Sequence, residues 1–374
     1  MPAPPMAEPA PKITAVLTVR NEAAFLLDWL AHHRAAGVTD FVVCSNACDD
    51  GTDAMLDRLA EMGWLAHLRN EGPYGNRGIQ FTALKLADKH PLVTNAHWLL
   101  PLDIDEFVNV KTGDNTLPAL LETLPDATAI TLTWRLFGNA GHARYDDIPV
   151  TERFTRCAPE VIFWPWRAVM FKTLYRNDGI YGKLGVHRPK APNRDRLDNA
   201  RWMDGEGRTL GGPFKTRRVF SDYGQPNYGL VQLNHYPLGD MESFVLKADR
   251  GRAVHADVPL ALDYWVERNF TTEEDTSIDA LKPGRDALRA DLMADATLAR
   301  LHAEAVAWRK ARFEALMRQE TFRALYARLL MAPPSHPISR EAAQHLTHFA
   351  LQDGQNINSE RSPPPVYKRS PPDV

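Results

Sequence analysis

The feature that most constrains the fold is a regular alternation of apolar strands and amphipathic helices over residues 12–110. The expected strands are short runs rich in β-branched and other apolar residues: Ile13–Val19, Asp40–Ser45, Trp64–Arg69 and His97–Asp105. Between them, apolar residues recur at helical spacing, as in the stripe of Met55, Leu56 and Leu59. Strands joined through helices need right-handed crossovers, so we predict an α/β fold with a Rossmann-like, mostly parallel sheet flanked by helices.

The rest of the chain divides by composition. A Pro-rich lead (1–11) and a polar, Pro/Ser-rich tail (353–374) are expected to be disordered. From about Ala129 the chain gives strand signals with aromatic, Gly/Pro-rich loops, and from Met241 it becomes helical. We therefore expect one domain over 12–275 and a helical C-terminal region over 276–352, with a long helical run from about Arg285 to Arg318.

Charge and targeting signals exclude several classes of protein. The 374 residues include 44 basic and 47 acidic side chains, for a net charge of −3, which gives no general attraction to nucleic acid. Three cysteines form no disulfide framework, and neither a signal peptide nor a transmembrane segment is evident. We expect a cytoplasmic protein whose contact with a membrane, if it has one, is peripheral, at the cytoplasmic face of the inner membrane.

Three carboxylates follow the fourth predicted strand, in the stretch "WLLPLDIDEFVNV" from Trp98 to Val110. Strand alternation predicts that Asp103 and Asp105 lie on one side, where they suit Mn²⁺ or Mg²⁺ held together with phosphate oxygens. The alternative is a solvated acidic turn. The position after a buried strand, at the sheet edge where ligands bind, favours the metal, with Glu106 in a structural role.

Two other polar segments should reach the same edge. Arg20 and the segment Ser45–Asp50 also follow predicted strands, so three segments are expected to converge on one crevice. No Walker A sequence is present, and "GPYGNRG" (Gly72–Gly78) has the wrong glycine spacing for a dinucleotide fingerprint. A cation site without these loops indicates a sugar nucleotide diphosphate.

At this point the chain resembles the glycosyltransferase family 2-like enzymes of GT-A fold, particularly the bacterial subgroup close to glycosyltransferase family 92. The stretches that carry the resemblance, in order, are "VRNEAAFLLDWLAHHRAAGV", "SNACDDGT", "WLLPLDIDEFV", "TWRLFGNAGH", "LNHYPLGDMESFVLKADRGRA" and "YWVERNF". The resemblance spans about residues 12–275, with a nucleotide-sugar half (12–110) and an acceptor half (111–240). It implies a hexosyltransferase of polysaccharide biosynthesis that uses Mn²⁺ or Mg²⁺ and moves sugar, with inversion, from a nucleotide diphosphate donor, UDP favoured, to a glycan or glycolipid.

The resemblance also assigns residues to the donor. Asn21 and Glu22 match residues that border the base and ribose, and Asp50 matches an acid that accepts a hydrogen bond from the base. Arg20 and Asn46, at the ends of the first two strands, are placed with them.

The metal and diphosphate ligands follow in the same way. Asp103 would contact the ribose or the metal, Asp105 the metal directly, and His235 would complete the metal site or contact the diphosphate. Without the resemblance His235 would be a hydrogen-bonded core histidine. Lys247 and Arg250, near "NHY", are candidates for the pyrophosphate because cationic side chains recognise it well.

The catalytic base is left open. Family 2 enzymes often carry a downstream Q-x-x-R-W block, which this chain lacks. The region expected to hold the acceptor contains Asp146, Asp147, Glu152, Asp178 and His187, and the leading candidates are Asp147, Asp178 and His187. Two other functions remain possible readings of the sequence: a nucleotidyltransferase with the same carboxylate–metal site, and a non-catalytic protein that binds nucleotide or carbohydrate.

Overall fold

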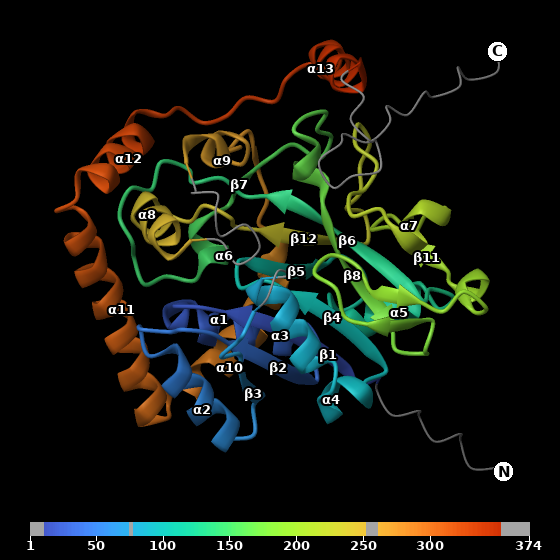
Figure 1. Cartoon of the computed structure of the whole chain (residues 1–374), viewed down its shortest axis with the longest axis horizontal. Helices are drawn as coiled ribbons and strands as arrows, with labels where there is room; N and C mark the ends of the chain where they lie inside the picture. Colours follow the sequence, from blue (N-terminus) through green and yellow to red (C-terminus); the bar gives the residue numbers. More distant parts are fainter. Residues whose placement is uncertain (1–10, 75–77, 252–260, 353–374) are drawn as a thin grey trace.

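A mixed β-sheet organises the molecule (Figure 1). The computed structural model describes residues 11–74, 78–251 and 261–352, so the predicted tail and nearly all of the predicted lead lie outside the described residues. Within them a nine-stranded sheet has the order β3-β2-β1-β4-β8-β6-β12-β5, with β11 beside β6. Its strands are β1 (Ile13–Val19), β2 (Asp40–Ser45), β3 (Ala66–Arg69), β4 (Trp98–Leu102), β5 (Glu106–Val110), β6 (Ala129–Leu136), β8 (Phe171–Arg176), β11 (Trp202–Met203) and β12 (Val231–His235).

The strands pair mostly in parallel, as predicted. β1 is parallel to β2 and β4, β2 to β3, and β6 to β11 and β12. Antiparallel pairing occurs where β8 inserts between β4 and β6 and where β5 pairs with β12. Two small hairpin-like pairs lie apart from this sheet: β9 (Tyr181–Lys183) with β10 (Lys190–Pro192), and β7 (Arg156–Cys157) with β13 (Glu273–Glu274). The predicted α/β class is confirmed.

Helices cover both faces of the parallel part of the sheet. One face, with Val16 and Val42, packs against α3 and α4; the other, with Ala15 and Leu17, packs against α1, α2, α10 and α11. The described helices are α1 (Ala23–Ala35), α2 (Thr52–Glu61), α3 (Ile79–Ala87), α4 (Pro91–Thr94), α5 (Leu117–Thr123), α6 (Val150–Arg153), α7 (Gly212–Thr216), α8 (Met241–Arg250), α9 (Leu262–Val266), α10 (Lys282–Met293), α11 (Ala296–Leu316), α12 (Glu320–Met331) and α13 (Arg340–Gln352).

The start of α1 depends on a residue from another loop. Asn21, just before this helix, does not cap it: Asn21 has a left-handed φ of 55° and accepts a hydrogen bond from the Asp49 N–H at 2.7 Å. The carboxylate of Asp50 accepts the free N–H of Ala23 at 3.0 Å. A tertiary contact thus supplies the acceptor that a local N-cap side chain usually provides.

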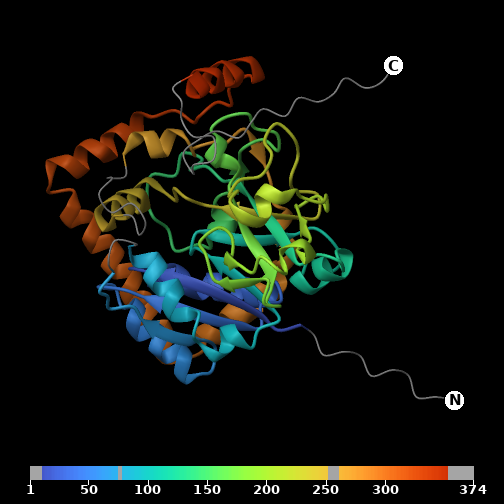
Figure 2. The ribbon, with the colours of Figure 1, turned by 45° about the vertical axis from the view of Figure 1, so that its right-hand side comes forward.

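The C-terminal helices wrap around one side of the molecule. The helical run expected from about Arg285 to Arg318 forms two helices, α10 and α11, and Asp295 caps α11 by accepting the Leu298 N–H at 2.9 Å. α11 contacts α1, α2 and α8 and runs along the left edge of Figure 1. Figure 2, turned by 45°, shows these orange helices behind the N-terminal strands. None of the helices in the described ranges combines the length and apolarity needed to cross a membrane.

Candidate donor and acceptor cleft

The acidic segment after β4 is a turn rather than an extension of the strand. β4 ends at Leu102, and the Glu106 N–H closes the turn on the Asp103 carbonyl at 3.2 Å. Glu106 is fully buried: its carboxylate accepts the Asp103 N–H at 2.8 Å and the indole N–H of Trp134 at 2.6 Å. Burial raises the pKa of Glu106 well above its ordinary value. These contacts give Glu106 the role of fixing the turn's shape.

Two lysines from distant segments neutralise the two aspartates. Lys172 of β8, whose side chain is 1% exposed, lies 2.7 Å from the Asp103 carboxylate, which also accepts the Gln80 amide N–H at 2.8 Å. Lys247 of α8 lies 2.7 Å from Asp105 and donates to the Pro237 carbonyl at 2.8 Å. The prediction that both aspartates project together from one strand is wrong, because the strand ends first and the turn directs them to different cations.

His235 is the second partner of Asp105. It ends β12, its ring packs 4.2 Å from that of Trp134, and its Nε2 lies 3.7 Å from an Asp105 oxygen. Burial lowers the pKa of His235, so its imidazole is neutral at pH 7, as a metal ligand must be. Burial opposes ionisation of Asp105, but the neighbouring Lys247 ammonium holds the pKa of this carboxyl well below the usual value.

The donor set fits a divalent cation shared with a ligand. In the described residues no group of three or more His, Cys, Asp or Glu side chains could enclose an ion. Both Asp103 oxygens already accept hydrogen bonds, whereas Asp105 and His235 face each other. One carboxylate and one imidazole, completed by phosphate oxygens and water, suit Mn²⁺ in particular. Asp105 and His235 are thus the residues that could hold the metal.

The loops after β1 and β2 meet α8 beside this turn. Arg250 of α8 donates to the Arg20 carbonyl at 2.8 Å and to the Glu22 carboxylate, and Arg20 donates back to the Arg250 carbonyl at 3.3 Å. The structure thereby brings together donor residues that the sequence separates by about 230 positions. Asn46, also predicted for the donor, is buried at the end of β2.

Both carboxylate oxygens of Asp50 accept hydrogen bonds from neighbouring groups of the protein. One oxygen accepts the Ala23 N–H, and the other accepts the N–H and hydroxyl of Thr52 at 2.9 and 2.5 Å. These bonds join the starts of α1 and α2 and leave the carboxylate buried. Its contact with a nucleotide base stays a prediction, whereas the neighbouring Asp49 side chain is exposed at the same loop.

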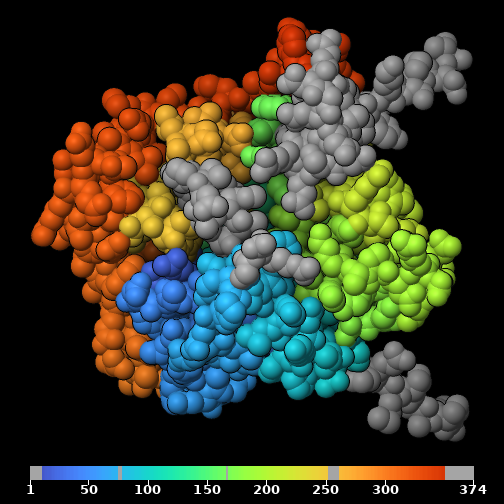
Figure 3. Space-filling model, in the orientation of Figure 1, coloured from blue at the N-terminus to red at the C-terminus, as the bar shows by residue number. Residues whose placement is uncertain are grey.

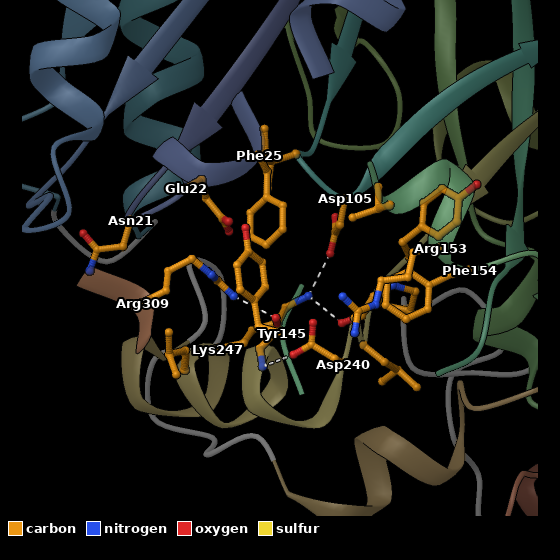
Figure 4. A pocket seen from close by; sticks show the side chains of 18 of the residues that line it. Asn21, Glu22, Phe25, Asp105, Tyr145, Arg153, Phe154, Asp240, Lys247 and Arg309 are labelled. Carbon is orange, nitrogen blue, oxygen red and sulfur yellow. Dashed lines mark hydrogen bonds and ion pairs between the residues drawn. The ribbon is translucent and has the colours of Figure 1, made fainter. Parts of the chain in front are cut away.

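A cleft lies beside Asp105 and Lys247, and both residues line it (Figure 4). It holds about 880 Å³ of space free of protein atoms, part of it open to solvent. Its lining combines the donor residues with side chains from the loop before α6, from α6 itself, from α8 and from α11. The lining residues include Asn21, Glu22, Phe25, Asp105, Tyr145, Asp146, Arg153, Phe154, Asp240, Lys247, Arg250, Trp308 and Arg309.

The three candidate bases lie outside this lining. Asp147 is 3.0 Å from the imidazole of His302, which holds its pKa low. Asp178 accepts the Ile180 N–H at 3.0 Å in the turn between β8 and β9. His187 bonds to the Phe171 carbonyl at 3.1 Å, and burial lowers its pKa to about 3. Two other carboxylates, Asp146 and Asp240, do line the cleft.

Several residues of the site had little or no signal in the sequence. Lys172 was detectable in principle, since a lysine inside the apolar run "VMFKTLY" must find a buried carboxylate. Trp308 and Arg309 lie on α11, beyond the family-like segment, and only packing brings this helix to the cleft.

The chain is similar to known proteins through a family model and through several solved structures. Residues 14–196 match the family model of glycosyltransferase family 92. Similar solved structures include a mannosyltransferase (PcManGT) from Pyrobaculum calidifontis in complex with GDP-Man and Mn²⁺, at 15% identity over 93% of this chain and 89% of that one, with a TM-score of 0.32. TarS 1-349 from S. aureus is similar at 13% identity over 82% and 91% of the two chains, with a TM-score of 0.31.

A third similar structure matches a smaller part of this chain. Glucosyl-3-phosphoglycerate synthase from Mycobacterium tuberculosis, in complex with Mn²⁺, UDP and glucosyl-3-phosphoglycerate, is 16% identical over 33% of this chain, with a TM-score of 0.23. The overlap spans 44% of the length of that synthase. No curated protein sequence matches the chain. The family model covers β1 to β10 and the Asp103–Glu106 turn, so this part of the chain matches a glycosyltransferase family 92 domain, and it has the α/β fold expected from the sequence.

Proposed function

We propose that the protein is a metal-dependent hexosyltransferase that moves sugar from a nucleotide diphosphate donor, UDP favoured, to a glycan or glycolipid acceptor with inversion. The observation that carries the proposal is the position of Asp105. It faces His235 at 3.7 Å and Lys247 at 2.7 Å, on the wall of a cleft and beside the loops of a family 92 domain.

The chain's own residues divide the work of the reaction. Arg20, Asn21, Glu22 and Asn46 are proposed to border the nucleotide, and Lys247 and Arg250 to bind the diphosphate. Asp105 and His235 would hold Mn²⁺ or Mg²⁺, which when bound supplies Lewis-acid stabilisation of the leaving diphosphate. Asp103 accepts hydrogen bonds from Lys172 and Gln80, so its proposed role is to fix the turn or to contact the ribose.

Inversion also needs a group that accepts the proton of the attacking hydroxyl. Asp146 and Asp240 line the cleft without a cation at hydrogen-bonding distance among the described residues, whereas the lining carboxylates Glu22, Asp105 and Asp249 pair with Arg250, Lys247 and Arg312. Asp240 is buried and caps α8, its Oδ1 accepting the Ser243 N–H at 2.7 Å. We assign the proton-accepting role to this pair, ahead of Asp147, Asp178 and His187.

Donor turnover by the purified full chain tests the proposal. UDP-sugars, offered with Mn²⁺ and a mixed glycan acceptor, should release UDP, and EDTA should stop the release until Mn²⁺ is restored. Asp105→Asn should lower the rate by about 10²–10³, the range typical of losing one preorganised electrostatic contact. Asp126→Asn, which removes an exposed carboxylate paired with Arg201 at 3.1 Å, is the matched control and should leave the rate unchanged.

The other outcomes point to the other functions. Pyrophosphate release from a nucleoside triphosphate would indicate a nucleotidyltransferase. A rise in Tm with UDP but no turnover of any UDP-sugar would indicate a non-catalytic relative. Full activity of Asp105→Asn, with the variant's Tm close to that of the wild type, would contradict the metal role.

A further inference from the structure

We propose that the cleft contains an oxyanion subsite formed by Arg153 and Arg309, so that the acceptor carries a carboxylate or phosphate group. The inference rests on the proposed function, because it takes the cleft next to Asp105 as the acceptor site. It adds the chemical class of the acceptor, which neither the family model nor the similar structures specify for this chain.

The first observation is that the Arg153 guanidinium has hydrogen-bond donors without a partner in the described part of the chain. The Arg153 side chain, at the end of α6, is 10% exposed and lines the cleft. Its Nη2 donates to the Arg144 carbonyl, but its Nε and Nη1 are buried and have no hydrogen-bond partner among the described residues. The carboxylate of Asp146 is 3.9 Å from Nη1, too far for a hydrogen bond, and is 65% exposed.

The second observation is a guanidinium held in place by aromatic rings. Arg309 of α11 is 6% exposed, and its Cζ lies 4.5 Å from the ring centre of Phe25 and 4.8 Å from that of Tyr145. Its Nη2 donates to the Ser243 hydroxyl at 2.7 Å, whereas its Nε is buried without a partner. The two adjacent rings, whose centres are 6.1 Å apart, and a hydrogen bond at one end fix the orientation of the group.

Neither of these two arginines has a carboxylate at hydrogen-bonding distance in the ranges that the structure describes. Among the acidic lining residues, Glu22 pairs with Arg250, Asp105 with Lys247, and Asp249 with Arg312 outside the cleft at 2.7 Å; Asp146 lies 3.9 Å from Arg153, and Asp240 caps α8. Within the described lining, Arg153 and Arg309 are the cationic side chains with no carboxylate at hydrogen-bonding distance. In Figure 4 they lie on either side of the Lys247–Asp105 pair.

The energetic argument follows from burial. A buried N–H without a partner is destabilising, and three such atoms belong to side chains that line one cleft here. A planar guanidinium with free donors matches the two oxygens of a carboxylate or phosphate. An oxyanion on the acceptor would satisfy these donors, and the apolar lining, including Phe154 and Trp308, would contact the sugar ring.

Binding of three matched probes to the full chain tests the subsite. Isothermal titration with Mn²⁺ and UDP present compares methyl β-glucuronide (a carboxylate), glucose 6-phosphate (a phosphate) and neutral methyl β-glucoside. Charge-assisted hydrogen bonds of about 1.5–3 kcal/mol correspond to a Kd about 10–100-fold lower for one of the anionic probes than for the neutral probe. Whether the carboxylate or the phosphate binds more tightly identifies the source of the anion.

Substitutions locate the effect. Arg153→Gln should bring the Kd of the anionic probe to within about threefold of the Kd of the neutral probe. Arg309→Gln, on the other wall of the cleft, should have the same effect. Two variants are used so that the test still works if one of them fails to fold. Arg201→Gln, at an exposed arginine outside the cleft, should keep the full preference.

Two results would overturn the subsite. One is a wild-type chain that binds neither anionic probe more tightly than the neutral one. The other is a folded Arg153→Gln and a folded Arg309→Gln that both retain the preference. UDP binding by the wild type is recorded first: its absence would refute the proposed function, whereas UDP binding without an anion preference would refute the subsite alone.

Discussion

At the residue scale, the acidic turn after β4 is stable because each carboxylate has its own counter-charge or donor. Asp103 has Lys172, Asp105 has Lys247, and Glu106 has the indole N–H of Trp134. The sequence correctly indicated that positive charge must gather there, but it pointed to a metal ion alone. The lysines come from β8 and α8, and no local pattern links them to the turn.

Buried histidines make stability depend on pH. His32, fully buried on α1, bonds through Nε2 to the Val108 carbonyl at 2.8 Å, and burial lowers its pKa to about 4. In the unfolded chain its pKa is near 6.5, so the unfolded state binds more protons between these values, and its contribution to stability is lost as pH falls below about 6.5.

His32→Gln keeps a donor for Val108 but cannot titrate. Between pH 7 and pH 5 the wild type should lose about 2 kcal/mol more free energy of unfolding than the variant. Urea titrations at both pH values measure the difference, with His336→Gln, at an exposed position, as the control for the substitution itself. An identical loss in wild type and His32→Gln would contradict the buried, neutral state of His32.

At the element scale, contacts from other segments fix where helices begin and how they are attached. Asp50 of the β2 loop caps α1, and Arg285 attaches α10 to the segment around α6. The Arg285 side chain is buried, donates to the Thr151 hydroxyl at 2.6 Å and pairs with Glu152 and Asp286.

Replacing this arginine should therefore be costly. Arg285→Met should lower the free energy of unfolding by about 3 kcal/mol, because it leaves partly buried carboxylate and hydroxyl groups without their donor. Arg300→Met removes an exposed pair with Glu304 one turn away and should cost less than about 0.5 kcal/mol. Urea unfolding followed by circular dichroism compares the two; equal effects would mean that Arg285 does not anchor α10.

At the scale of the whole molecule, α10 and the first part of α11 belong to the main core. Ile278, Leu292, Leu298 and Leu301 join the apolar cluster that covers one face of the sheet, and α11 continues to the cleft. On the face shown in Figure 3, the N-terminal segment (blue to cyan) lies directly beside the C-terminal helices (orange). These helices should therefore unfold with the sheet.

Leu298→Ala tests this coupling. Leu298 is fully buried, so its truncation should cost about 3 kcal/mol. The midpoints of urea unfolding by circular dichroism and by tryptophan fluorescence should shift together. Leu330→Ala, at an exposed position on α12, should change stability by less than about 0.5 kcal/mol. Separate midpoints for the two signals would instead show that the helices unfold as an independent unit.

The sequence by itself determined the elements whose cause is local. Apolar runs and helical periodicity gave β1 and β2 their observed bounds, and strand–helix alternation predicted the parallel part of the sheet. Family-like motifs located Asp105 and His235, which the fold then placed 3.7 Å apart.

Only the tertiary structure decided which charges meet and which surfaces enclose the cleft. Lys172, Arg153 and Arg309 reach the site from β8, α6 and α11, elements far from the acidic turn in sequence. Hydrophobic patterning specifies that these elements pack, but not which polar side chains they bring into contact. Pairing of buried charges depends on the full three-dimensional arrangement, because removal from water makes each pairing strong and each unpaired group costly.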